Sequence, residues 1–158
     1  MTRLRHVWLA LTVLTATLFN ARRRALFREM RAFIHHLPVV LKAPLPQALQ
    51  QITPPAGGVS ESEQNVRQLA DVIALLDRRS PLGLCLRRSL TRYYFLHRAD
   101  VPVIVHFGAK FVGGRPDRDI TGHAWLTLAG EPYYESGENW RGFTVMLSYP
   151  PSDGKIPT

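Results

Sequence analysis

The chain is a basic polypeptide of 158 residues with 20 Lys and Arg, 12 Asp and Glu, and a single cysteine. Its length fits one domain of about 100–200 residues, and its 46% apolar composition argues against intrinsic disorder. One cysteine excludes an internal disulfide framework and a zinc site built from cysteines. The net charge of +8 makes nucleic acid or an anionic membrane surface the first partner to consider.

The basic charge is concentrated at one end of the chain. Residues 1–31 hold seven arginines and one acid, for a net charge of +6, whereas residues 32–158 carry only +2. Within this end, Val7 to Phe19 is an uncharged run of 13 residues, and a membrane-spanning helix needs about 20. The arginine-rich end lacks base-reading polar residues at a regular spacing, so specific nucleic-acid binding is not expected.

Two interpretations of residues 1–31 stay open. In the first, they form a helix that lies on the inner face of a membrane and binds anionic lipid headgroups through its arginines. In the second, the apolar run packs on the domain and is followed by a solvated basic helix. A secretory signal peptide has a similar layout, but Asn20-Ala21-Arg22 offers no clean cleavage site. We therefore expect a cytoplasmic protein.

The first half of the chain predicts helices on both sides of a linker. Few helix breakers occur over residues 5–36, which predicts a helix. Five prolines and two glycines over residues 38–58 predict a linker, with one helical turn near residues 47–51. Ser60 and Glu63 fit a capping box for the next helix, which should end at Asp77-Arg78-Arg79-Ser80.

The second half predicts one helix and then a small sheet. Pro81 and Gly83 break the chain, and a helix should run from Leu84–Cys85 to about Arg98. We expect strands over residues 101–108, 122–129, 131–136 and 143–148, a turn centred on Ala129-Gly130, a polar loop over residues 113–117 and an irregular tail from Pro150. Helices followed by antiparallel strands form an α+β pattern.

Cys85 is the first candidate for chemistry. It falls in the first turn of a predicted helix, where unpaired backbone amides and the helix dipole favour a thiolate. Arg87 and Arg88 add positive charge nearby. A buried structural cysteine is the alternative, because free cysteines are among the most buried residues.

His123 and Glu135 are the second and third candidates. His123 begins a predicted strand and shares a face with Trp125, which indicates a half-covered cleft. If the following hairpin turn carries a one-residue bulge, Glu135 lies directly opposite His123 and its carboxylate can orient the imidazole. If the turn has two residues, the Glu135 side chain falls on the wrong face. Glu138 is a weaker substitute, and Glu131 falls in the turn.

These three residue types suit nucleophilic catalysis. A thiolate attacks a carbonyl, an imidazole moves protons, and an acid orients the imidazole. The amide of Cys85 would supply part of an oxyanion hole. Papain-like and transglutaminase-like enzymes also have this order, with a cysteine on a helix, a histidine on a strand and an acid on the next strand.

No cofactor is expected. His35, His36, His97 and His106 form no metal-ligand spacing with an acid or a cysteine, so no metal site is predicted. The chain also has no GxxxxGK[ST] run that would bind a nucleotide triphosphate.

Four pieces of sequence occur in a specific order. They are Cys85-Leu86-Arg87-Arg88-Ser89-Leu90, a short strand ending in Gly108, His123-Ala124-Trp125, and Gly130-Glu131-Pro132 with an acid 12 residues after the histidine. In this order they resemble the transglutaminase-like leader peptidases of lasso-peptide biosynthesis, which are stand-alone cysteine proteases. The similarity covers about residues 62–148.

The resemblance implies a fold, an activity and partners. It implies a papain/transglutaminase-like core over residues 59–150, in which the cysteine helix packs on a small antiparallel sheet. A helical, arginine-rich segment with a linker (residues 1–58) precedes this core, and an irregular tail (residues 151–158) follows it. The activity implied is removal of the leader from a ribosomally made precursor peptide. The partners implied are that precursor, a separate leader-recognition protein and a lasso cyclase.

The resemblance also assigns roles to the three candidates. Cys85 matches the nucleophile and His123 the general base, while Glu135 stands where an aspartate is usual. Two other functions stay open at this point. The chain could be a transglutaminase-like acyltransferase or amidase with another substrate, or a non-catalytic membrane-surface scaffold in which Cys85 is merely buried.

Overall fold

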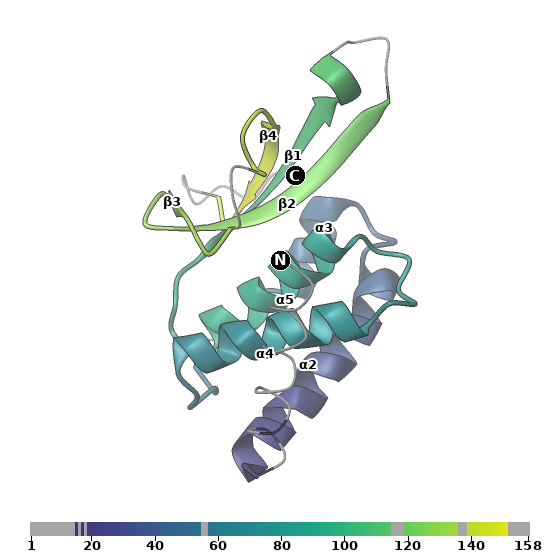
Figure 1. The fold of residues 1–158 in the computed structure, drawn as a ribbon. Helices are drawn as coiled ribbons and strands as arrows, with labels where there is room; N and C mark the ends of the chain where they lie inside the picture. The colour runs from purple at the N-terminus through teal and green to yellow at the C-terminus, as the bar shows by residue number, and fades with distance from the viewer. Residues whose placement is uncertain are drawn as a thin grey trace.

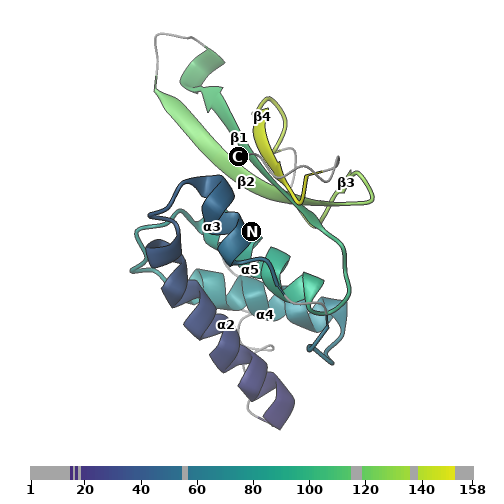
Figure 2. The same cartoon turned by 180° about the vertical axis from the view of Figure 1, so that it is seen from behind.

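The structure is a computed structural model that describes residues 15, 17, 19–54, 57–114, 119–135 and 139–151. This part of the chain forms two layers, with four α-helices packed below a four-stranded antiparallel sheet (Figures 1 and 2). The predicted α+β fold class is confirmed. Within the described ranges, no helix has the length and apolar character needed to cross a membrane.

Helix α2 spans Ala21–Val40, so the predicted helix over residues 5–36 is interrupted at residues 19–20 and extends past residue 36, while residues 5–14 lie outside the described part. It begins at Asn20, whose extended backbone (φ −123, ψ 115) and side-chain bonds to the amides two and three residues on make it an N-cap. At the other end the helix continues through Pro38. Burial of Leu37 and Val40 in the core holds this last turn, although proline contributes no amide hydrogen.

Two further helices follow. The predicted linker contains α3, Leu45–Gln51, which is longer than the single turn expected and buries Leu49. Helix α4 spans Glu63–Leu76 and is capped by Ser62, because its hydroxyl accepts a hydrogen bond of 3.3 Å from the amide of Asn65. The prediction of Ser60 as the cap is therefore wrong by two residues, whereas the predicted end of the helix is confirmed.

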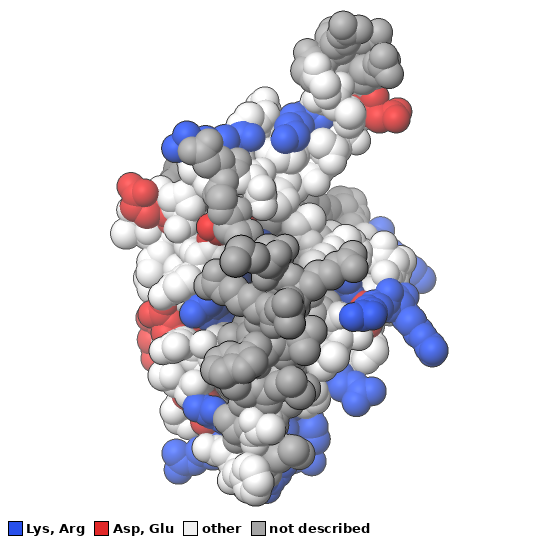
Figure 3. Space-filling view, in the orientation of Figure 1, with Lys and Arg blue, Asp and Glu red and all other residues white. Residues whose placement is uncertain are grey.

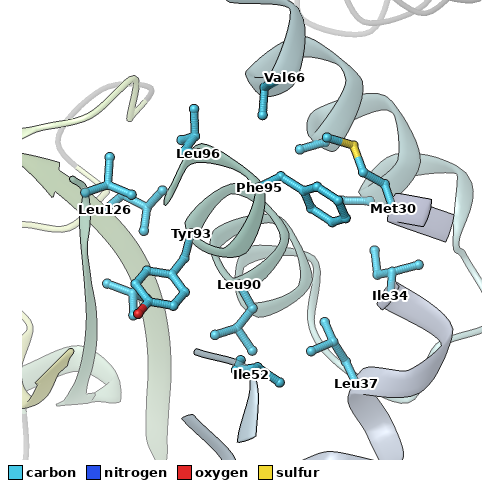
Figure 4. Packing of buried hydrophobic residues seen from close by; sticks show 14 of the residues in the cluster. Met30, Ile34, Leu37, Ile52, Val66, Leu90, Tyr93, Phe95, Leu96 and Leu126 are labelled. Atoms are coloured by element: carbon cyan, nitrogen blue, oxygen red, sulfur yellow. The ribbon is translucent and has the colours of Figure 1, made fainter. Parts of the chain in front are cut away.

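Helix α5, Leu84–His97, agrees with the predicted helix and forms the centre of the core. Figure 4 shows α5 nearly end-on, with Phe95 directed toward Met30 of α2 and Tyr93 directed toward the sheet. Phe95 is 1% exposed and Met30 is fully buried. Packing on several sides fixes the position of the helix that carries Cys85.

The sheet has the strand order β3-β2-β1-β4, and each neighbouring pair is antiparallel. Its strands are β1 (Ile104–Phe111), β2 (Ile120–Leu128), β3 (Glu131–Pro132) and β4 (Thr144–Tyr149), and the short 3-10 helix η1 (Val112–Gly114) follows β1. Val105 and Leu126 face each other in the core, whereas His106 and Trp125 pair on the opposite face. The first strand begins later than predicted, and the third is much shorter.

Some predictions concern residues that the structure does not describe. The apolar run from Val7 is described only at residues 15, 17 and 19, and Glu138 and residues 152–158 lie outside the described part. On the face drawn in Figure 3, blue Lys and Arg side chains lie mainly over the helical half, and red acidic side chains lie mostly along the left edge with a further group at the upper right. The described cations on this face are therefore spread over the helices, with acids beside them.

Candidate active site

Cys85 is the second residue of α5, as its sequence position predicted. Gly83 is the N-cap, and no side chain caps the helix. The amide of Arg87 makes the first helical hydrogen bond, 3.1 Å to the carbonyl of Gly83. The amides of Leu84, Cys85 and Leu86 precede that bond and point out of the helix end. Cys85 is a free, half-buried thiol beside these amides.

Ser89 joins this helix to the strand that carries His123. Its buried hydroxyl donates a hydrogen bond of 2.9 Å to the carbonyl of Ala124, the residue after His123. Ser89 lies one helical turn after Cys85, and residues four apart share a side of a helix. The first turn of α5 is therefore fixed next to the stretch of β2 that holds His123.

The imidazole of His123 is held by aromatic rings. It stacks on Trp125, with 5.9 Å between centroids and 15° between planes, and its centroid lies 5.3 Å from that of Phe143. Its Nε2 is buried and has no hydrogen-bond partner among the described residues. Burial lowers the pKa of His123, and the charges of Arg88 and Lys110 lower this pKa further. The ring is thus a neutral base at neutral pH.

Trp125 also stacks on a second imidazole, that of His106, with 5.5 Å between centroids and 27° between planes. Both nitrogens of His106 are occupied, Nδ1 by the Ser148 hydroxyl and Nε2 by the Thr127 hydroxyl, each at 2.8 Å. A Cβ at Gly108 would lie 2.9 Å from the Trp125 ring, so this close approach requires glycine. These contacts set the plane of the indole against which His123 rests.

The turn before Glu135 has two residues. Leu128 pairs with Glu131, and Ala129 and Gly130 both have positive φ (51 and 85), as a type I′ turn requires. The one-residue bulge that would place Glu135 directly opposite His123 is therefore absent from the hairpin turn. The structure takes the other alternative left open by the sequence.

Glu135 is bound by arginines of α5. One carboxylate oxygen accepts a hydrogen bond of 2.8 Å from Arg88, and the other lies 3.9 Å from Arg92. Its side chain is 1% exposed, and this burial raises the pKa of the Glu135 carboxyl while the two arginines act against the rise. Among the described residues no hydrogen bond joins Glu135 to His123.

Contacts with α4 hold the chain near Glu135 in this position. Tyr134 has a positive φ of 50, which turns the backbone away from β2 and explains why β3 is short. The Tyr133 hydroxyl donates a hydrogen bond of 2.7 Å to Glu63, and the guanidinium of Arg67 lies 3.7 Å from the centroid of the Tyr134 ring. Glu135 is consequently directed toward the helical layer.

The structure thus places Cys85 and His123 on adjoining parts of α5 and β2, and Arg88 links the surroundings of His123 to Glu135. Sequence reasoning did not identify Ser89 or the pairing of Arg88 with Glu135. The spacing of Arg88 and Arg92, four residues apart on one helix, was the available signal for a shared acidic partner. Within the described ranges, no three His, Cys, Asp or Glu side chains form a group that could hold a metal ion.

Comparison with known protein families matches residues 9–148 to the transglutaminase-like superfamily. The chain belongs to this superfamily. Members of the transglutaminase-like superfamily are typically enzymes of the cysteine-protease or transglutaminase kind. No curated protein and no solved structure matches the chain.

Proposed function

We propose that this transglutaminase-like protein is a cysteine peptidase that removes the leader from a ribosomally made lasso-peptide precursor. The observation that carries the proposal is the position of Cys85 at an open helix end, one turn before the Ser89–Ala124 bond that fixes α5 beside His123. Superfamily membership supports acyl chemistry at this pair. Leader removal rests on the resemblance of the motifs around Cys85 and His123.

In the acylation step, neutral His123 takes the proton of the Cys85 thiol, directly or through a water. The sulfur then forms a bond to the scissile carbonyl carbon, and the amides at the start of α5 donate to the developing oxyanion. The carbon–nitrogen bond breaks as the imidazolium gives its proton to the leaving amine. The lowered pKa of His123 supports this role, because it keeps the base form available at neutral pH.

In the deacylation step, His123 removes a proton from water, and the oxygen attacks the thioester carbonyl. The carbon–sulfur bond breaks, and the imidazolium returns its proton to the Cys85 sulfur. The products are a free leader with a new carboxylate and a core peptide with a free amine. No electrons are transferred in either step.

Glu135 is proposed as the acid that supports His123 through Arg88. Its carboxylate pairs with the Arg88 guanidinium, whose charge acts on His123. Neutralising that charge lessens its effect on the imidazole and stabilises the imidazolium that forms during catalysis. This role makes Glu135 a positioning residue and predicts that its loss weakens catalysis without abolishing it.

The proposed partners are the precursor peptide, a separate leader-recognition protein and a lasso cyclase. The decisive experiment incubates the full chain with a lasso precursor and its recognition protein and follows leader release by mass spectrometry. Cleavage that is lost in Cys85→Ala and His123→Ala but only weakened in Glu135→Gln is expected. Undiminished cleavage by Cys85→Ala would end the proposal.

Acyl transfer is a second candidate, because the family match reaches the superfamily as a whole. The same acyl-enzyme can be attacked by an amine in place of water. Adding a primary amine, such as a lysine-containing peptide, to the cleavage assay distinguishes the two. Hydrolysis gives the free leader acid, whereas acyltransferase activity gives a leader–amine conjugate that increases with amine concentration.

A non-catalytic scaffold makes a different prediction for Cys85. If the thiol only fills space in the fold, a thiol-reactive probe should modify it in the folded chain no faster than an ordinary, partly buried cysteine thiol. If Cys85 is the nucleophile, modification should be fast and should slow markedly in His123→Ala. Mass spectrometry after brief labelling of the native protein measures both rates.

A further inference from the structure

We propose that a groove between α2 and the end of α4 binds an acidic amphipathic helix of a partner protein. The groove has a volume of about 590 Å³ and lies in the helical layer. Its lining residues are Phe27, Arg31, Ile34, His35, Ile73, Leu76, Asp77, Arg78 and Arg79. This inference does not depend on the cleavage chemistry proposed above, because none of these residues belongs to the candidate active site.

The floor of the groove is apolar and recessed. Ile34 is fully buried and Ile73 is 3% exposed, while Phe27 is half-buried beside them. Leu76 is 55% exposed and stands at the last turn of α4. Phe27 and Leu76 therefore supply the apolar surface that an occupant can contact, above the buried Ile34 and Ile73.

The rim is basic and lacks counter-charges. Arg31, Arg78 and Arg79 are exposed, and none of them has an ion pair or side-chain hydrogen bond among the described residues. Asp77 is the one acid among the described lining residues; it lies 3.5 Å from the Arg87 guanidinium, and both side chains are 9% exposed. Three free cations around an apolar floor complement an occupant that is both apolar and acidic.

The charge of the chain argues against an occupant from this protein. A second copy carries a net charge of +8 and would be repelled by the rim. Residues 1–14 are apolar enough to enter the groove, but they contain Arg3 and Arg5 and no acid. Both facts favour a different molecule with negative charge.

The shape of the groove favours a protein segment over a lipid bilayer. A bilayer surface takes up apolar side chains that project from a protein, whereas Ile34 and Ile73 lie at the bottom of a concavity. An amphipathic helix inserts residues of its apolar face into such a groove and presents its flanks to the rim. Asp or Glu on those flanks would pair with Arg31, Arg78 and Arg79.

The test measures binding of synthetic peptides to the full chain by fluorescence anisotropy. The probes are two labelled helical peptides of roughly 16 residues with the same leucine stripe, one with glutamates and one with lysines on its flanks. We expect the acidic peptide to bind at least about tenfold more tightly than the basic one, and we expect this affinity to fall as salt is added.

Variants locate the binding site. The variants Arg78→Ser/Arg79→Ser and Leu76→Asp should each lower the affinity for the acidic peptide by about tenfold or more. All three residues are exposed, so both variants should keep the folded state, which circular dichroism checks. Arg22→Ser/Lys42→Ser is the matched control, since it removes two exposed cations that do not line the groove. This control should change affinity by less than about twofold at moderate salt.

Three results would overturn the proposal. They are no binding of the acidic peptide, equal binding of the two peptides, and equal loss of binding in the groove variants and the control. Phosphatidylglycerol vesicles form a separate arm of the experiment. Sedimentation of the chain with these vesicles that is lost in Arg78→Ser/Arg79→Ser would make lipid the occupant and also contradict the proposal.

Discussion

The hydroxyl of Ser89 donates a hydrogen bond of 2.9 Å to the carbonyl of Ala124, and this bond joins the helix of Cys85 to the strand of His123. Ser89→Ala should leave that carbonyl without its partner and lower the free energy of unfolding by about 1–2 kcal/mol. It should also lower kcat for leader cleavage, because the first turn of α5 is no longer tied to β2. Urea unfolding and a cleavage assay check the two effects.

Thr91 provides the matched control for Ser89. It is also fully buried on α5, but its hydroxyl has no hydrogen-bond partner among the described residues. Thr91→Val removes that hydroxyl at nearly constant volume, so stability should stay the same or increase. A loss of cleavage in Thr91→Val as large as that in Ser89→Ala would show that any change in α5 impairs the enzyme.

Gly108→Ala should displace the Trp125 and Phe143 rings that contact His123. The added methyl group would lie 2.9 Å from the Trp125 ring and 3.0 Å from Cβ of Phe143. We expect a loss of about 1–3 kcal/mol in stability together with a lower kcat, because the indole that His123 rests on must move. Thermal unfolding and the cleavage assay measure these changes.

Gly122→Ala is the comparison in the same sheet. Its added Cβ would lie 3.8 Å from the Gly108 carbonyl, an ordinary contact distance. This variant should therefore fold and cleave nearly as the parent chain does. Equal damage from both substitutions would contradict the role assigned to the close approach of Gly108 and Trp125.

Local sequence signals predicted the main elements well. Pro81 and Gly83 before an apolar periodicity located the start of α5, and therefore located Cys85 in its first turn. The Ala129-Gly130 turn was also visible, because glycine at position 130 takes positive φ without a steric cost. The cap of α4 was misplaced because Ser60 and Ser62 stand close together, and only the bond to Asn65 distinguishes them.

The surroundings of Glu135 could not be predicted in the same way. Its partner Arg88 is 47 residues away in sequence, and the contact exists only because β3 ends early and the chain turns toward the helices. The positive φ at Tyr134 and the bond from Tyr133 to Glu63 decide that course. A prediction from hairpin register assumes a regular strand, so it includes neither the positive φ at Tyr134 nor the bond from Tyr133 to Glu63.

Lys110→Ala should shift the pH dependence of catalysis. Catalysis needs neutral His123, and burial and nearby cations lower its pKa from the ordinary 6.5. The fall of kcat/KM on the acid side of the pH–rate profile (the acid limb) should therefore lie below pH 6.5. Removing the Lys110 charge raises the pKa of His123, which should move the acid limb to higher pH. A pH–rate profile and an NMR titration of the imidazole measure this shift.

Lys42→Ala is the control for the effect of Lys110. Lys42 is also exposed, but it follows α2 and is not among the charges that act on His123. Its removal should leave the acid limb in place. If the two lysine variants gave the same profile as the parent chain, the electrostatic contribution of Lys110 to His123 would be refuted.

Arg92→Ala should destabilise the fold strongly. Arg92 is 3% exposed and donates two hydrogen bonds, of 2.6 and 2.7 Å, to Asp71. Its removal leaves Asp71 and the buried Glu135 with less positive charge, at a cost of about 3–5 kcal/mol. In contrast, Glu29→Ala removes the half-exposed partner of the Arg98 ion pair and should cost less than about 1 kcal/mol. Urea unfolding compares the free energies of unfolding of the two variants. Similar decreases would contradict the stabilising role assigned to Arg92.

The most direct test of the proposed function is acid-quenched mass spectrometry of the full chain during turnover of a lasso precursor with its recognition protein. The account predicts a transient adduct with the mass of the leader on the peptide that contains Cys85. This adduct should be absent in Cys85→Ala and strongly reduced in His123→Ala. Leader cleavage that continues in Cys85→Ala, or an adduct mapped to another residue, would contradict it.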